Sequence, residues 1–294
     1  MATLRDIKRR IRSVQSTQKI TRAMKHVAAS KFRRAQERIL QARPYASKMG
    51  ELLGNLVESA GPAAHPLLEQ RHGPRRQIVI ITADKGLAGA FNSNVIRFSL
   101  EFVRESSASD VTLVVVGRKG RDFYRRRPWT IKTERLGFWD QLAYSHASEL
   151  ADGFVRAYVS GEIDEVHLLY NEFRSAAAQR PVRQQLLPIV EGAAAAAPQG
   201  QPASPAEYLY EPSAEAILGE LLPRHIRTQV YRALMESLAG EYGARMTAME
   251  AATENAKEMI ETLTIQFNKA RQEAITKELL EIVGGAEALK QGDR

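Results

Sequence analysis

The chain has 294 residues, no cysteine and a formal net charge of +8. This length allows one large domain or two small ones, and the lack of cysteine excludes disulfides, thiol catalysis and thiolate metal sites. The longest apolar runs, IVIIT at 78–82 and VTLVVV at 111–116, are far shorter than the roughly 20 residues that a membrane-spanning helix needs. The N-terminus lacks the apolar core of a secretory signal, so we expect it to be part of the mature protein.

The charge is distributed unevenly along the chain. Residues 1–43 are strongly basic, with only Asp6 and Glu37 opposing their lysines and arginines, whereas the sequence from 207 onward is rich in glutamate. A basic segment is compatible with a nucleic acid, an anionic membrane, an acidic protein partner or a solvated helix face. Charge alone therefore leaves several classes of partner open.

Residues 1–60 are predicted to form one long helix. Apolar or small residues recur at alternating steps of three and four, which is the heptad seam of a coiled coil, and they are Leu4, Ile7, Ile11, Val14, Ala28, Phe32, Ala35, Ile39, Ala42, Ala46, Met49, Leu53 and Leu56. Between Val14 and Ala28 the seam positions turn polar, and the apolar stripe is expected to move to Ile20, Met24 and Val27.

Residues 208–290 are predicted to form a second long helix. Pro212 and Ser213 are typical of a helix start, and small or apolar residues again step by three and four at Met249, Ala252, Ala256, Met259, Leu263, Phe267, Ala270 and Ala274. Two long helices at opposite ends of a chain, one basic and one acidic, are expected to pair as an antiparallel coiled coil that forms a slim rod.

The middle of the chain, residues 75–190, predicts a small Rossmann-like α/β domain. Three β-branched runs at 77–83, 111–117 and 165–171 alternate with helical patterns at 94–105 and 144–161, an order typical of a parallel sheet. Residues 180–189 favour an added edge strand. The segment 191–207 is rich in alanine and proline, so a flexible loop is expected to separate this domain from the second long helix.

The stretch ADKGLAGAFNSN at 83–94 follows the first predicted strand, where α/β proteins often hold phosphate. Its glycines fit neither GxGxxG nor GxxxxGK[ST], so we expect it to be a packing turn in which Gly86 and Gly89 allow close approach and Asn92 or Ser93 caps the next helix. The histidines show no paired metal spacing, and His167 sits in a strand pattern that favours packing. The sequence therefore predicts no nucleotide, cofactor, metal or catalytic site in this chain.

Four segments resemble one family, the gamma subunit of F-type ATP synthases. They are SVQSTQKITRAMKHVAASKFRRAQ at 13–36, the turn TADKGLAGAFNSN, YLYEP at 208–212, and residues 245–289 beginning RMTAMEAATENAKEM. Together they span nearly the whole chain in the family's order. The resemblance implies a noncatalytic central-stalk rotor, which couples rotation of the membrane c-ring to conformational changes in a ring of three alpha and three beta subunits.

The resemblance also implies partner contacts for individual residues. Arg271, Gln272 and Thr276 match a stretch that meets a loop of beta, Met24 and Lys25 match a position near the beta lever, and Tyr208 and Glu211 match a segment on the side of the c-ring and the epsilon subunit. Met24 is equally compatible with seam packing, and Glu211 with a charge favoured at a helix start. Glu273 departs from the small residue usual there, so the local contact is expected to differ.

The resemblance favours a peripheral protein on the cytoplasmic face of a bacterial inner membrane, with no nucleic-acid partner. Two other classes remain open from the residues themselves. A nucleic-acid-binding coiled coil would use the basic helix, although that helix shows no known DNA-binding motif. A small α/β nucleotide enzyme would use the glycine turn, and saturable binding of ATP or NAD would reveal it.

Overall fold

The computed structural model describes residues 3–61, 65–71, 73–105, 110–189 and 213–292. Tyr208, Glu211 and the predicted loop at 191–207 lie outside these residues. The described chain belongs to two compact units, one formed by Met1–Val27 with Ala248–Arg294 and the other by Ala28–Thr247. We call them the paired-helix unit and the α/β unit.

Both predicted long helices are present. They are α1 (Leu4–Ala60) and α5 (Ala214–Gly292), and each contributes residues to both units. The start of α5 follows the predicted signal, because the Ser213 hydroxyl oxygen accepts a hydrogen bond from the Ala216 amide at 3.3 Å and Glu215 lies in the first turn.

In the paired-helix unit, α1 and α5 run antiparallel, as predicted. Thr21 lies opposite Thr253, with their hydroxyl oxygens 2.8 Å apart, and Lys25 lies opposite the earlier residue Glu250. The seam contains Ile7 from α1 and Met249 and Ala256 from α5, all buried.

The seam of α1 turns polar between Val14 and Ala28, as predicted, but the apolar side chains of Ile20 and Val27 do not replace it. Ile20 and Val27 are 60% and 58% exposed, whereas Thr21 is buried and continues the seam. A polar residue can occupy the seam here because the Thr21 hydroxyl shares a hydrogen bond with Thr253 and contacts the carbonyl oxygen of Gln18. Met24 lies between these extremes, partly buried beside the seam.

The α/β unit contains a five-stranded sheet in the order β3-β2-β1-β4-β5. Its strands are β1 (Arg76–Ile81), β2 (Val111–Val116), β3 (Thr130–Arg135), β4 (Glu165–Phe173) and β5 (Gln179–Leu187). The first four are parallel and β5 pairs antiparallel with β4, so residues 180–189 do supply the predicted edge strand. The Rossmann-like prediction is therefore confirmed as a fold.

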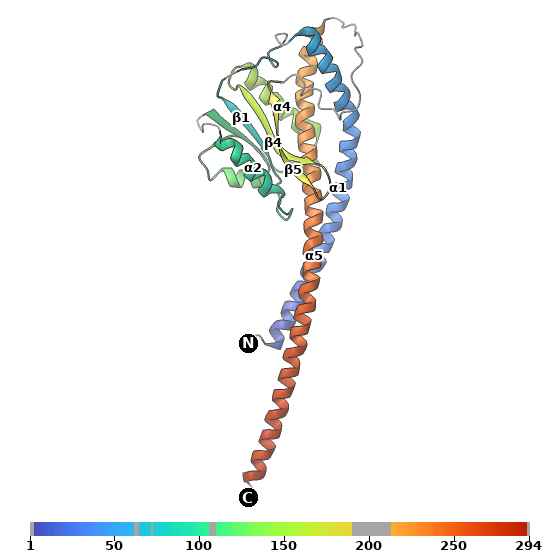
Figure 1. Ribbon diagram of the computed structural model, residues 1–294, viewed down its shortest axis with the longest axis vertical. Coiled ribbons are helices and arrows are strands. Elements are labelled where there is room, and N and C mark those ends of the chain that lie inside the picture. The colour runs from blue at the N-terminus through green and yellow to red at the C-terminus, as the bar shows by residue number, and fades with distance from the viewer. Residues whose placement is uncertain (1–2, 62–64, 72, 106–109, 190–212, 293–294) are drawn as a thin grey trace. The chain divides into compact units, whose positions relative to one another are not determined.

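Helices cover both faces of this sheet, as Figure 1 shows. Ile78 and Ile80 of β1 point into a core under α2 (Phe91–Arg104) and α3 (Arg118–Tyr124). Val79 and Ile81 point into the larger core formed with α4 (Tyr144–Val159), α1 and α5. Burial on both faces explains why β1 and β2 read as continuous apolar runs rather than as alternating patterns.

Two elements were not predicted from the sequence. The edge strand β3 has the sequence TIKTER, whose charged residues obscure its strand character, and α3 has only 7 residues. Charges on an edge strand discourage pairing with another chain, so this composition suits its position at the margin of the sheet. A short 3-10 turn, η3 (Trp139–Gln141), follows β3 and leads into α4.

Candidate partner interface

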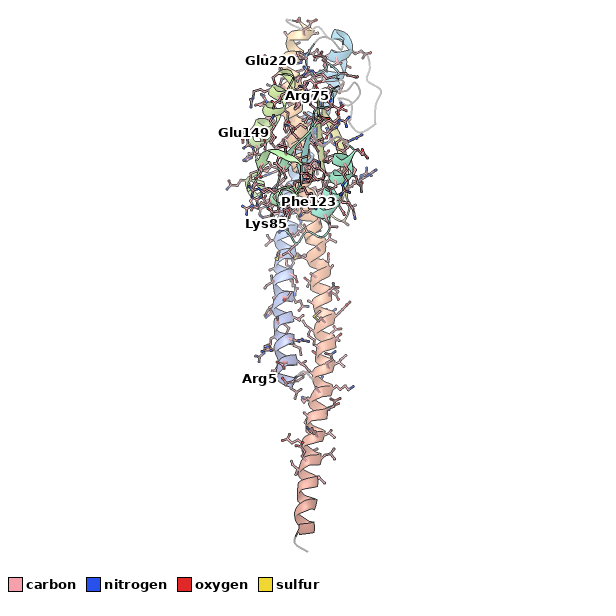
Figure 2. The ribbon with its side chains drawn as sticks, turned by 90° about the vertical axis from the view of Figure 1, so that its left-hand side faces the viewer. Arg5, Arg75, Lys85, Phe123, Glu149 and Glu220 are labelled. Carbon is pink, nitrogen blue, oxygen red and sulfur yellow. The ribbon has the colours of Figure 1, made fainter. Side chains whose placement is uncertain are left out.

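The glycine turn after β1 lies at the carboxyl edge of the parallel strands, the edge at which Rossmann-like folds bind phosphate. Figure 2 shows Lys85 of this turn near the lower margin of the α/β unit, well below Arg75, which precedes β1. The Asp84 carboxylate accepts hydrogen bonds from the Arg118 amide at 2.9 Å and from the Gly137 amide at 2.8 Å. The Arg118 amide at the start of α3, which could have faced a phosphate, thus binds an acidic side chain of the chain itself.

Asn92 and Ser93 do not cap α2, contrary to expectation. The helix already begins at Phe91, so both residues lie inside its first turn. The Asn92 side chain instead closes the turn, because its Oδ1 accepts a hydrogen bond from the Ala83 amide at 2.9 Å. Of the two glycines, only Gly89 has the positive φ that favours glycine, and a Cβ added to Gly86 would make only ordinary contacts with Lys119.

The histidine geometry agrees with a packing role. His167 is buried in β4 with its Nε2 3.0 Å from a carboxylate oxygen of Glu165 and its ring edge-on to Phe102. Burial lowers the pKa of His167. Within the described residues, no group of three or more His, Asp or Glu side chains is placed to hold a metal ion.

The residues expected to contact beta all lie in the paired-helix unit, at two levels of the helices. Lys25 forms an ion pair with Glu250, its Nζ lying 2.5 Å from Oε1, and two thirds of the Lys25 side chain is covered. Arg271, Gln272 and Thr276 lie further along α5 and are fully available on its surface. The structure thus brings Arg271, Gln272 and Thr276 onto neighbouring turns but does not bring them together with Met24 and Lys25.

The C-terminal part of α5 is exposed on all sides. Every residue from 271 to 284 is exposed, including five large apolar side chains, Ile275, Leu279, Leu280, Ile282 and Val283. A cluster of large apolar side chains on a surface marks a place where another molecule binds. No helix in the described ranges is long and apolar enough to cross a membrane.

Sequence reasoning identified Arg271, Gln272 and Thr276 only through family resemblance, and it missed a cluster of polar residues in the α/β unit. Asp140 in η3 contacts Lys31 of α1 and Lys85 of the glycine turn. No motif links these three positions, which are far apart in the sequence, so only the fold reveals them.

Comparison with known proteins agrees with the fold. The sequence model of a family described as ATP synthase matches residues 3–289. A Desulfitobacterium hafniense protein named ATP synthase gamma chain is 52% identical over 290 residues, covering 99% of this chain and all of that protein. The protein of the same name from Moorella thermoacetica is 51% identical over 290 residues, with the same coverage.

Solved structures of mitochondrial ATP synthases also resemble the chain. A chain of the Tetrahymena thermophila central stalk and c-ring structure is 26% identical with a TM-score of 0.60, and the match covers 79% of this chain and 99% of that one. A chain of the Euglena gracilis enzyme in rotational state 3 covers 99% of this chain and 96% of its own length with a TM-score of 0.69, and at 21% identity it supports the fold alone. With a matched family model and relatives at about half identity over nearly the full length, the chain belongs to the ATP synthase gamma chain family.

Proposed function

We propose that the chain is the central-stalk rotor that couples ion-driven rotation of a membrane c-ring to sequential conformational changes in a ring of alpha and beta subunits. In the reverse direction, ATP hydrolysis in that ring would turn the chain. The chain itself would be noncatalytic and would bind no nucleotide, with one copy for every three alpha and three beta subunits.

The observation that carries this proposal is the exposed apolar end of α5. Residues 271–284 include Leu280 and Val283, which are 67% and 64% exposed. Leaving such side chains in water is unfavourable, so a surrounding partner would stabilise this end of the helix. A smooth apolar sleeve supplied by the alpha and beta ring would cover these residues without locking them at one angle.

Arg271, Gln272 and Thr276 would provide the polar contacts to a loop of beta. All three are exposed in the chain, so they are free to bind a partner without unfolding any part of α5. Met24 and Lys25 would lie near the acidic lever of beta. Lys25 already pairs with Glu250. To bind an acidic segment of beta, Lys25 would therefore have to bind both carboxylates or release Glu250.

Tyr208 and Glu211 would face the c-ring and the epsilon subunit. This part of the proposal rests on the family resemblance of YLYEP at 208–212. The chain would then be a peripheral protein on the cytoplasmic face of a bacterial inner membrane, held there by its partners and not by a span of its own. A nucleic-acid partner is not part of the proposal.

Reconstitution tests the proposal directly. The chain is expressed with alpha and beta subunits from the same genome, the complex is purified through a tag on beta, and ATP hydrolysis is measured with and without the chain. We expect one copy per three beta subunits and a loss of multi-site turnover when the chain is omitted. If the ring assembles, hydrolyses ATP equally well and excludes the chain, the rotor proposal is wrong.

Single substitutions test the beta contact. Arg271→Ala and Gln272→Ala are expected to lower ATP turnover of the complex while leaving the yield and thermal unfolding of the chain unchanged, because both side chains are exposed. Arg97→Ala, which removes an exposed arginine from α2 instead, serves as the matched control. Equal turnover in all three variants and the unsubstituted complex would remove the assignment of Arg271 and Gln272 to the beta contact.

A further inference from the structure

A cluster of charged and aromatic residues joins the carboxyl edge of the sheet to both long helices. Asp140, in η3 after β3, uses one carboxylate oxygen for each of two lysines. Its Oδ1 lies 2.5 Å from Nζ of Lys31 on α1, and its Oδ2 lies 3.1 Å from Nζ of Lys85 in the turn after β1. These two lysines hold the pKa of Asp140 well below its usual value, at about 2, so the carboxylate stays charged throughout the neutral range.

The second long helix joins the same cluster through Tyr242. The Lys31 ammonium lies 5.5 Å from the centroid of the Tyr242 ring, a cation–π contact, and Tyr242 is buried with an exposed fraction of only 9%. Burial raises the pKa of Tyr242, and the nearby Asp140 carboxylate raises it further. Glu241, the residue before Tyr242, pairs with Arg245 about one turn further along α5, so this buried carboxylate has a partner of its own.

Close packing surrounds this cluster. A Cβ added to Gly243 of α5 would lie 2.9 Å from the Ala176 carbonyl oxygen, and one added to Gly240 would lie 3.2 Å from the Phe91 ring. On α1, Phe32 packs against Phe173 at the end of β4, with their ring centroids 5.6 Å apart. Both helices therefore touch the sheet and its loops at the same level as the charged cluster.

The position of the cluster along the chain matters for its role. Lys31 and Tyr242 lie within about two helical turns of the residues at which the α/β unit ends, between Val27 and Ala28 on α1 and between Thr247 and Ala248 on α5. Apolar packing resists separation of two surfaces but is not directional, whereas hydrogen-bonded ion pairs specify an orientation. A directional contact at this level opposes rotation of the sheet about the two helices.

We propose that Asp140 is a positioning residue whose carboxylate holds the carboxyl edge of the sheet against the segments of α1 and α5 in the same unit, so that torque passes between the sheet and these helix segments without slip. The clamp consists of Asp140, Lys31, Lys85 and Tyr242. This inference rests on the proposed rotor function. It assigns to the clamp the rigid attachment of the sheet to the two helices. Loss of the Asp140 charge leaves the fold intact but lets the sheet occupy more than one orientation relative to these segments of α1 and α5.

The test uses the complete complex in inverted membrane vesicles, in which ATP hydrolysis drives proton uptake. Phosphate release and proton uptake are measured on the same vesicles for the unsubstituted complex, Asp140→Asn, Asp140→Glu and the control Glu149→Gln. Glu149 forms an exposed ion pair with Arg135 on the same unit, away from the Asp140 cluster in sequence and in its partner. A partly exposed ion pair biases an equilibrium by about two- to fivefold, so Asp140→Asn is expected to lower proton uptake per ATP hydrolysed by a factor of that size.

The remaining variants distinguish a role of Asp140 in positioning the sheet from a role in the stability of the fold. Asp140→Glu keeps the charge and is expected to restore the ratio of proton uptake to ATP hydrolysis, and Glu149→Gln is expected to leave it unchanged. Thermal unfolding of the chain should shift little in Asp140→Asn, because the Asp140 side chain is 53% exposed. An unaltered ratio in Asp140→Asn overturns the clamp, as does a lower ratio that is accompanied by a clearly lower thermal midpoint.

Failure of the clamp can be told apart from failure of the rotor proposal. If vesicles lacking the chain hydrolyse ATP and take up protons as well as complete ones, the rotor proposal fails whatever the variants do. If Asp140→Asn does not assemble, Lys31→Met and Lys85→Met each remove one arm of the clamp, and both are expected to lower the ratio. An unchanged ratio in both of those variants overturns the clamp.

Discussion

His225 makes the stability of the chain depend on pH in a way that can be calculated. It lies in α5 and is 5% exposed, next in sequence to Ile226 of the larger core. Burial lowers its pKa from 6.5 to about 4. The folded chain therefore keeps His225 neutral over a pH range in which the unfolded chain would protonate it.

The sign and size of the effect follow from proton binding. Between the folded pKa of about 4 and the unfolded value of 6.5, the unfolded chain binds the extra proton, so the free energy of unfolding falls as the pH falls. Lowering the pH from about 7 to about 5 should cost about 2 kcal/mol through this residue alone. The stability that neutral His225 preserves is complete above the unfolded pKa and is lost progressively toward the folded one.

The assay is urea unfolding of the full chain, followed by circular dichroism at both pH values, for the natural sequence and for His225→Gln. Glutamine does not titrate, so the variant lacks this contribution while other groups, including His65 and His167 with their lowered pKa values, remain in both proteins. We expect the natural chain to lose about 2 kcal/mol more than the variant on acidification. An identical pH dependence in the two proteins would refute the burial argument for His225.

Two further stability predictions use neighbouring or similar residues as controls. Leu53 is fully buried and Leu52 is 37% exposed, so Leu53→Ala should cost about 2–5 kcal/mol in urea unfolding and Leu52→Ala much less; similar losses would contradict the assigned faces of α1. Gly117 and Gly161 both have positive φ, but a Cβ on Gly117 would overlap the Thr82 carbonyl group whereas one on Gly161 meets nothing nearby. Gly161→Ala should therefore lower the free energy of unfolding by about 1–2 kcal/mol from backbone strain alone, and Gly117→Ala should lower it clearly more. Thermal unfolding of both variants measures the difference, and a smaller loss of stability for Gly117→Ala would argue against this packing.

Local patterns in the sequence determined the long helices and the central strands. Heptad steps identified seam residues such as Ile7, Ala28, Leu53 and Met249, all of which are buried, and the β-branched runs identified β1, β2 and β4. These predictions succeed because helix and strand periodicities depend on residues close in sequence. The family-specific residues Arg271, Gln272 and Thr276 followed from resemblance, since exposed side chains leave no periodic signal.

Tertiary structure decided the features that depend on distant residues. Thr21 occupies the seam because Thr253 lies opposite it, Asn92 closes a turn because the Ala83 amide faces it, and β3 is a strand because β2 offers it a partner. Asp140 is likewise an ordinary acidic residue in the sequence and becomes a link among three segments only when folding brings Lys31 and Lys85 to it. The sequence by itself determined which segments are helix and core strand, because short-range spacing encodes burial; polar partners are chosen by the fold, because a hydrogen bond requires proximity that local spacing does not specify.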